Sequence, residues 1–213
     1  LNSKINSFFG NFLIGLEYIF NQSGPMTMGA SQVCGFLKSD PSRATPNLQF
    51  HVQPISTDIL GATKMHDFDG ITPTIANIRP TSRGEINIVS NDSRDNPKIK
   101  MNYLSTQDDR DVAAKALKIV RKIMLETKAF KKYEPEEYRP GVHITDDEEL
   151  VQAGSKHTQT IFHPVGTCKM GIGEDSVVDD KLKVRGLENL RIVDASIMPN
   201  ITSGNTNAPT IMI

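Results

Sequence analysis

The spacing of apolar residues predicts one short helix near the start of the chain and a region of strands after it. Between residues 11 and 20 the apolar side chains recur at helical spacing, and Gly24-Pro25 ends the pattern. Three later segments alternate apolar and polar residues in the manner of half-buried strands: residues 48–52, 71–78 and 84–89. Because turn residues such as Asp69-Gly70 separate these segments, we expect a mostly antiparallel sheet.

Two longer helices are predicted further along. Ser105 to Asp108 resembles a capping motif, and the apolar residues behind it keep to one face of a helix that runs to about Lys128. Thr145 to Glu148 repeats the capping pattern with an acidic first turn and opens a second helix toward Thr160. The sequence therefore predicts an α+β fold in which helices back an antiparallel sheet.

From Ile161 onward glycines divide the chain into turns, and one compact strand is expected at Leu190–Asp194. We expect the functional residues to be concentrated in this segment. Gly171-Ile-Gly173 lacks a third glycine at the offset of a dinucleotide-binding loop, so we interpret it as a turn.

Composition and charge exclude several classes of function. The chain has 213 residues, and 24 Lys+Arg against 25 Asp+Glu leave a formal charge of -1, so nothing draws it to nucleic acid or to an anionic membrane. No apolar run reaches the roughly 18 residues of a membrane span, so a soluble, cytoplasmic chain is expected, with secretion left open. Cys34 and Cys168 belong to no CxxC pair, and no histidine pair has metal-ligand spacing, so we expect no metal site. The P-loop, HExxH and GxSxG motifs are also absent from the sequence, which removes support for NTPases and hydrolases.

His163 is the leading candidate for a catalytic base. Pro164 stiffens the backbone after it, and Gly166 permits a tight turn, so the imidazole would be held firmly. Histidine titrates near neutral pH and can take a proton from an alcohol. On this segment alone, a hydrogen-bonded core histidine explains the pattern equally well. The other four histidines are expected to have structural or surface roles: His51, His66, His143 and His157.

Two further signals lie toward the end of the chain. Asp194 ends the predicted strand and precedes Ala195, an arrangement that can deliver a polar group to a ligand crevice; an ordinary cap or turn aspartate is the alternative. Asn205 and Asn207 stand just before the apolar residues 210–213, where a helix amino terminus would stabilise negative charge; simple capping is the alternative.

Taken in order, these segments form a specific series of motifs: His163-Pro-Val-Gly-Thr-Cys168, Leu190-Arg-Ile-Val-Asp-Ala-Ser196 and Ser203-Gly-Asn-Thr-Asn-Ala-Pro209. The series resembles the glucose-methanol-choline (GMC) oxidoreductases, densely from Thr160 to Ile213. Upstream the resemblance is thinner and rests on three short segments: Arg79-Pro-Thr-Ser-Arg-Gly84, Asn102-Tyr-Leu104 and Ser23-Gly-Pro25. It therefore covers most of the chain.

The resemblance implies an FAD-dependent oxidation of an alcohol CH–OH group. Family members bind FAD in an amino-terminal Rossmann-type half and carry a substrate domain on an about six-stranded, largely antiparallel sheet. By motif, the active-site pair falls on His163 and Asn205. The implied roles are that His163 accepts the hydroxyl proton while the carbinol carbon gives hydride to flavin N5. Asn205 orients the alcohol oxygen, because a neutral amide cannot act as a base.

By the same resemblance, seven residues match FAD-contacting positions: Asp194, Ala195, Asn205, Thr206, Asn207, Ala208 and Pro209. The implied division of the chain is a connection from the FAD-domain region (1–45), a substrate-binding α+β domain (46–160) and an active-site segment that contacts FAD (161–213).

The chain begins with Leu and lacks the GxGxxG of the family's FAD half. We therefore expect a fragment that binds FAD poorly by itself and has no turnover. The expected partners are a small-molecule alcohol, the missing FAD-binding half and a homo-oligomer as an open possibility. Choline, sugars, aryl alcohols and aliphatic alcohols stay open as substrates, as does the choice between oxidase and dehydrogenase. The alternative is a non-catalytic substrate-binding or interaction module.

Overall fold

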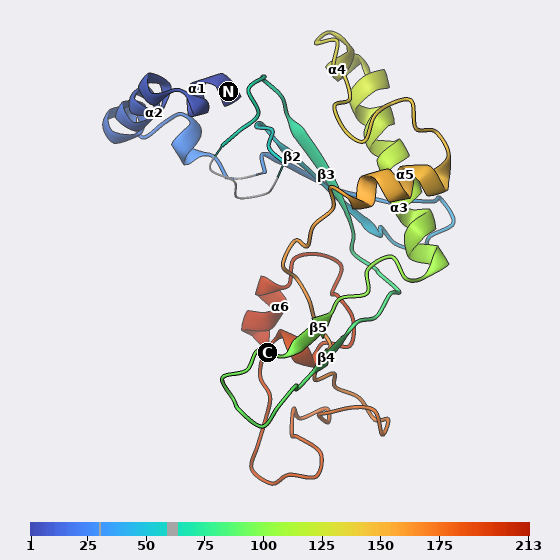
Figure 1. The fold of residues 1–213 in the computed structure, drawn as a ribbon. Coiled ribbons are helices and arrows are strands. Elements are labelled where there is room, and N and C mark those ends of the chain that lie inside the picture. The colour runs from blue at the N-terminus through green and yellow to red at the C-terminus, as the bar shows by residue number, and fades with distance from the viewer. Residues whose placement is uncertain (30, 59–63) are drawn as a thin grey trace. The chain divides into compact units, whose positions relative to one another are not determined.

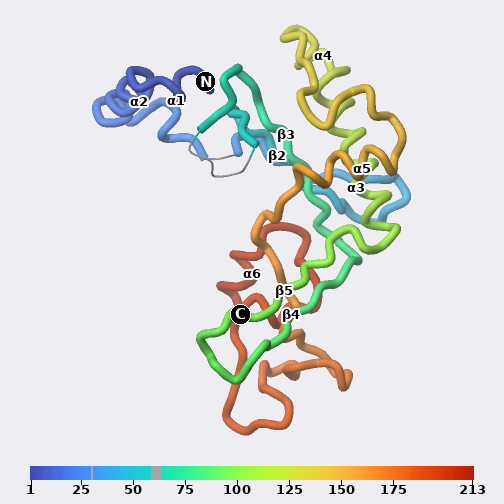
Figure 2. Tube along the Cα trace, viewed as in Figure 1, coloured from blue at the N-terminus to red at the C-terminus, as the bar shows by residue number. Residues whose placement is uncertain are grey.

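The computed structural model describes residues 1–29, 31–58 and 64–213. Its elements fall into two compact units, each made from two stretches of the chain. The first unit comprises residues 1–76 with 116–143, and the second comprises residues 77–115 with 144–213. Figures 1 and 2 trace the chain from its blue amino terminus to its red carboxyl terminus.

Two helices open the first unit, α1 at Asn2–Asn6 and α2 at Phe8–Asn21. Ser7 caps α2, because its hydroxyl accepts a hydrogen bond from the Gly10 N–H at 3.3 Å. The short helix expected near the start of the chain is confirmed, and it begins three residues before the predicted range. A 3₁₀ turn at Pro25–Thr27 follows it.

Three strands form the sheet of the first unit, in the order β1-β2-β3: β1 Val33–Leu37, β2 Leu48–Gln53 and β3 Thr72–Asn77. Strands β1 and β2 are antiparallel, with Val33 opposite Val52. Leu48, on the central strand, is fully buried. The predicted strands at 48–52 and 71–78 are confirmed. β1 escaped prediction because its sequence, Val-Cys-Gly-Phe-Leu, carries no regular apolar and polar alternation.

The second unit holds a smaller antiparallel sheet of β4, Glu85–Asn87, and β5, Lys98–Lys100. The described residues therefore form five strands in two sheets, and the expectation of an about six-stranded sheet is wrong. The strand predicted at Leu190–Asp194 is part of the error, because only an isolated bridge between Lys183 and Arg191 forms there. Left-handed backbone occurs at three residues upstream of the predicted strand: Leu182 (φ 64), Gly186 (φ 78) and Asn189 (φ 60).

The two longer helices form where the capping motifs predicted them. Helix α3 spans Gln107–Arg121 and passes into a π-helical turn at Lys122–Glu126, and the short α4 follows at Lys128–Lys131. Helix α5 spans Asp147–Ser155, so it ends five residues before the expected Thr160. Among the described residues, no helix combines the length and the apolar character that crossing a bilayer requires.

The acidic start of α5 agrees with the predicted motif, although the capping residue is Asp146 and not Thr145. The Asp146 carboxylate accepts hydrogen bonds from the backbone N–H groups of Glu148 and Glu149, both at 3.0 Å. Leu150, on the next turn, is fully buried and fixes the helix against its unit.

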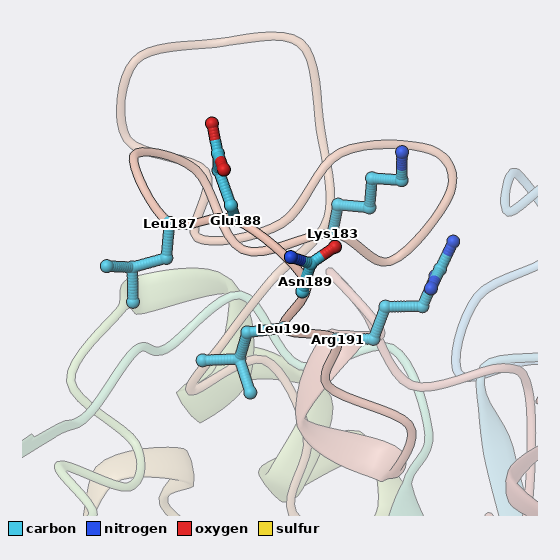
Figure 3. Close-up of a pocket in the computed structure, with 6 residues that line it drawn as sticks. All are labelled: Lys183, Leu187, Glu188, Asn189, Leu190 and Arg191. Atoms are coloured by element: carbon cyan, nitrogen blue, oxygen red, sulfur yellow. The ribbon is translucent and has the colours of Figure 1, made fainter.

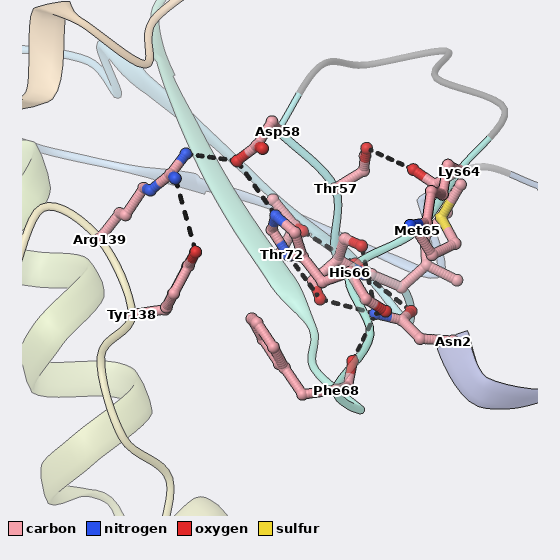
Figure 4. A network of polar contacts seen from close by, with 12 residues as sticks. Asn2, Thr57, Asp58, Lys64, Met65, His66, Phe68, Thr72, Tyr138 and Arg139 are labelled. Carbon is pink, nitrogen blue, oxygen red and sulfur yellow. Dashed lines mark hydrogen bonds and ion pairs between the residues drawn. The ribbon is translucent and has the colours of Figure 1, made fainter. Parts of the chain in front are cut away.

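A buried amide ties the chain start to the loop after β2 in the first unit (Figure 4). Asn2 is fully buried, and its amide nitrogen donates to Ser56 Oγ and to the Phe68 carbonyl, both at 2.8 Å. Its amide oxygen accepts from the Ser56 N–H at 3.1 Å. His66 belongs to the same network, with Nδ1 3.2 Å from Ser56 Oγ.

Candidate active site

The backbone around His163 is tightly turned. Phe162 has φ 63, a left-handed conformation that is uncommon for a residue with a bulky side chain, and its N–H donates to Thr160 Oγ1 at 3.0 Å. Pro164 restricts the conformation on the other side. The imidazole of His163 is half-buried on this loop.

Gly166 brings the segment after His163 against residues 195–198. Its φ of 91 confirms the expected tight turn, and a Cβ there would lie 3.3 Å from the Met198 carbonyl oxygen. The Cys168 N–H then donates to the Ser196 carbonyl at 3.0 Å. The motif containing His163 and the motif containing Asp194 therefore run beside each other in the second unit.

The structure brings His163 and Asn205 together across 42 positions of sequence. Asn205 Nδ2 lies 2.7 Å from His163 Nε2, and Thr206 Oγ1 lies 3.0 Å from His163 Nδ1. Asn205 is exposed, whereas Thr206 is 7% exposed and has a fixed position behind the ring. Each ring nitrogen thus has one polar side chain facing it.

This arrangement indicates one tautomer of the neutral imidazole. With the amide nitrogen of Asn205 donating to it, Nε2 is an acceptor, so the ring proton lies on Nδ1, and the Thr206 hydroxyl can accept it. The backbone N–H of Thr206 also points at Nδ1 from 3.4 Å, a contact that suits the opposite tautomer. The hydroxyl contact is the shorter by 0.4 Å and is compatible with Asn205, so we assign the proton to Nδ1.

Helix α6, Asn207–Met212, confirms the helix start expected after Asn205. Its N-cap residue is Thr206, but the Thr206 side chain makes no capping hydrogen bond and instead faces His163. The Thr206 carbonyl accepts from Thr210 Oγ1 at 2.6 Å, which ties the turn to the helix. The sequence predicted only a cofactor contact for Thr206; its contact with His163 depends on the packing of two distant loops, for which the motif carries no signal.

Asp194 caps a 3₁₀ turn at Ala195–Ile197, where its carboxylate accepts from the Ser196 N–H at 2.7 Å. Hydrogen bonds from Ser196 lower the pKa of this carboxyl group below its usual range. The geometry is that of the ordinary cap considered as the alternative for Asp194, and no strand delivers it. A carboxylate in this position remains charged at neutral pH.

An open hollow of about 320 Å³ lies elsewhere in the second unit, and His163 does not line it. Figure 3 shows the charged ends of Lys183 and Arg191 extending away from Leu187 and Leu190 on the other side. The hollow overlaps the predicted strand only at Leu190 and Arg191, and all six lining residues are exposed.

The described residues contain no cluster of three or more His, Cys, Asp or Glu side chains that could hold a metal ion. Cys34 is exposed and Cys168 is half-buried, and both are free thiols.

Comparisons with known proteins identify the family of this chain. The GMC oxidoreductase family matches residues 80–213. An alcohol dehydrogenase [acceptor] of Pseudomonas putida is 45% identical over 208 residues, which is 97% of this chain and 37% of that protein. An oxygen-dependent choline dehydrogenase of Pectobacterium carotovorum is 41% identical over 94% of this chain and 35% of its own length. The chain thus spans little more than a third of these relatives.

Solved structures show the same fold. Pyridoxine 4-oxidase from Mesorbium loti matches with a TM-score of 0.75 and 28% identity, over 85% of this chain and 36% of the other. A formate oxidase of Aspergillus oryzae has a TM-score of 0.82 at 22% identity, over 94% of this chain and 39% of the other, a likeness of fold alone. With a family match over more than half of its residues, this chain belongs to the GMC oxidoreductases.

Proposed function

We propose that this chain supplies the active-site portion of an FAD-dependent oxidoreductase that oxidises the CH–OH group of an alcohol. The observation that carries the proposal is the pairing of His163 Nε2 with the Asn205 amide at 2.7 Å. FAD is the cofactor indicated by membership of the GMC family. The relatives named for alcohol and choline support an alcohol substrate.

The turn before α6 offers backbone donors that would serve a flavin ring. The N-cap of α6 has no side-chain capping bond, so first-turn N–H groups of Asn207 and Ala208 have no side-chain cap to compete with a ligand oxygen. Asn207 to Pro209 would hold the pyrimidine edge, and Asp194 with Ala195 would lie along the ribityl and pyrophosphate part. Bound there, FAD supplies the acceptor for the hydride that leaves the carbinol carbon.

The proton of the alcohol is taken by His163. Its Nε2 carries a lone pair in the assigned tautomer and lies beside the Asn205 NH₂ group. An alcohol oxygen that replaces this direct contact would accept a hydrogen bond from the Asn205 amide and donate its proton to Nε2. Asn205 therefore orients the oxygen, and His163 acts as the base.

Thr206 keeps that lone pair available. Its hydroxyl accepts the Nδ1 proton, so Nε2 stays unprotonated before the reaction. When Nε2 gains the substrate proton, the same hydroxyl still accepts from Nδ1 and stabilises the imidazolium. The proton moves without a change of hydrogen-bond partner at Nδ1.

The test uses the flavin-loaded protein, meaning this chain together with an FAD-binding half, and follows its anaerobic bleaching by a panel of alcohols through the flavin absorbance. We expect His163→Ala to lower the bleaching rate by about 10²–10⁴-fold, the usual effect of losing a general base, with flavin content retained. Unchanged bleaching in the variant would remove His163 from the mechanism. If the wild-type protein holds flavin but none of the alcohols bleaches it, a non-catalytic binding module would be favoured instead.

The 213-residue chain by itself is proposed to hold FAD weakly and to turn over no alcohol. The same absorbance measurement on the purified chain tests this. Stoichiometric yellow flavin that survives gel filtration would contradict it.

A further inference from the structure

The segment Arg79–Gly84 has no part in the proposed reaction, yet two of its arginines contact the loop that carries Asn205. An Arg79 Nη2 hydrogen bond reaches Ser203 Oγ. Arg83 Nη2 donates to Asn200 Oδ1 at 2.7 Å. These contacts join positions more than 110 residues apart within the second unit.

A buried carboxylate anchors the arginine segment to α3. Asp109 is 4% exposed and accepts hydrogen bonds from the Thr81 N–H at 2.9 Å and the Ser82 N–H at 2.8 Å. The amide of Asn77 adds a third donor at 3.1 Å. Burial acts to raise the pKa of Asp109, but the hydrogen bonds from Ser82 and Thr81 outweigh it, and the pKa is lowered. The backbone that presents the two arginines is therefore fixed to a helix.

The guanidinium of Arg83 is itself held in place. Its Nη1 donates to the carbonyls of Pro80 and Ser82 at 2.9 and 3.0 Å, which leaves Nη2 directed at Asn200. The Arg83 carbonyl in turn accepts from Asn102 Nδ2 at 2.9 Å. A planar fork fixed on one side loses little further freedom when its other side binds.

The contacted loop lies between two buried residues, Met198 and Thr206. Within it, Ser203 has φ 69, a left-handed conformation that a residue with a Cβ adopts only when its surroundings favour it. The Arg79 contact is made by this residue, and Asn205 follows two positions later. A shift at Ser203 would move the Asn205 amide from His163 Nε2.

We propose that Arg79 and Arg83 are positioning residues that clamp residues 200–203 and thereby hold Asn205 and Thr206 against His163. The kinetic part of this inference rests on the proposed function. Neither arginine contacts His163, so both act through the loop. A positional error of about 1 Å at a reacting group can lower a rate by about 10²-fold, so the clamp matters beyond the stability of a surface contact.

Hydrogen exchange of the 213-residue chain tests the clamp without flavin or turnover. We expect Arg79→Ala and Arg83→Ala each to speed exchange of amides in residues 200–206 by about tenfold, because local opening needs fewer broken contacts. The melting temperature should stay unchanged. Arg94→Ala is the matched control, since Arg94 is an exposed arginine of the same unit that pairs with Asp92. Unchanged exchange at 200–206, or an equal rise throughout the chain, would overturn the proposal.

A double-mutant cycle in the flavin-loaded protein tests the consequence for the reaction. Arg83→Ala and Asn200→Ala should each lower kcat by about tenfold with KM within twofold, and the double variant should be no slower than either alone. Additive losses, or a change confined to KM, would contradict the clamp. If His163→Ala leaves bleaching unchanged, the proposed function fails, while the exchange experiment still decides the clamp.

Discussion

Two histidines of this protein have similar surroundings at one ring nitrogen and different ones at the other. His66, in the first unit, has Ser56 Oγ 3.2 Å from Nδ1, and Asp58 Oδ1 lies 3.0 Å from Nε2 (Figure 4). His163, in the second unit, has the Thr206 hydroxyl at Nδ1 and the Asn205 amide at Nε2. The difference is a carboxylate at one Nε2 and a neutral amide at the other.

That difference decides in which ring Nε2 keeps a lone pair that can accept a proton. A carboxylate only accepts, so Nε2 of His66 carries the proton. In the neutral ring Nδ1 then lacks a proton and accepts a hydrogen bond from the Ser56 hydroxyl. Both nitrogens of His66 are committed to the fold, whereas Nε2 of His163 can exchange its amide partner for a substrate. A histidine with a neutral partner can act as a base.

Aromatic contacts around His66 also indicate a structural role for this residue. Phe68 stacks on the imidazole at 4.9 Å and 18°, and Tyr138 meets it edge-on at 5.2 Å. Arg139 lies over the Tyr138 ring and also pairs with Asp58. Aromatic packing, together with the charges of Asp58 and Arg139, gives this cluster a structural role within the first unit.

Among the variants that test this difference between the two histidines, Asn205→Asp should have the largest effect on kcat, because it gives His163 the carboxylate partner that His66 has. A charge beside Nε2 stabilises the imidazolium, so His163 would keep its proton to higher pH. We expect kcat at pH 7 to fall by about 10²-fold. The pH range over which kcat increases should shift to higher pH. The measurement is kcat of the flavin-loaded protein against pH.

Asn189→Asp is the control for Asn205→Asp, since Asn189 is an exposed asparagine of the same unit away from His163. It adds the same charge and should leave the pH profile in place. A profile unchanged by Asn205→Asp would mean that this side chain does not face Nε2 during turnover.

A smaller effect is expected from Thr206→Val, which removes the hydroxyl but keeps the branched shape and the backbone N–H. The remaining N–H at 3.4 Å favours a proton on Nε2, so the lone pair of the base would be lost from part of the population. We expect kcat to fall by about tenfold, at the low end of effects on general-base catalysis. ¹⁵N NMR of histidine-labelled protein should show His163 shifting from the Nδ1–H to the Nε2–H tautomer.

Thr206→Ser keeps the hydroxyl and should restore both the rate and the tautomer. Loss of activity in Thr206→Val and Thr206→Ser alike would indicate packing instead of proton placement. An Nε2–H tautomer already present in the wild-type protein would refute the assignment.

The pairing of His163 with Asn205 was implied by the resemblance to the GMC family, because each residue stands in a short, specific motif of that family. The sequence predicted the helices at α3 and α5 because capping residues and apolar spacing are local signals. It failed at Leu190–Asp194, where apolar residues suggested a strand but only Arg191 forms an isolated bridge, because a short apolar run carries no signal for a pairing partner.

The contacts of Thr206, Arg79 and Arg83 could not be predicted for a different reason. Each joins loops that meet only in the folded unit, and no periodicity connects a threonine to a histidine 43 positions away. Motif resemblance can name such residues without saying what they touch. The roles proposed for them therefore rest on the distances between side chains.

The smallest effect is expected from Asp58→Asn, which gives His66 a neutral partner like that of His163. The hydrogen bond with His66, followed by the charge of Arg139, holds the pKa of Asp58 below its ordinary value of 3.8. Because the folded pKa is the lower one, the pair stabilises the fold above pH 3.8, and this stabilisation is lost as the pH falls through the folded pKa.

We therefore expect the variant to melt slightly below the wild-type protein at pH 7, with the difference vanishing in acid. The shift should be small because Asp58 is solvent-exposed. Melting curves from pH 7 to pH 3 measure it, and alcohol-dependent bleaching of the flavin-loaded protein should be unaffected. A loss of bleaching in Asp58→Asn would break the comparison, because His66 would then contribute to the reaction and not only to the fold.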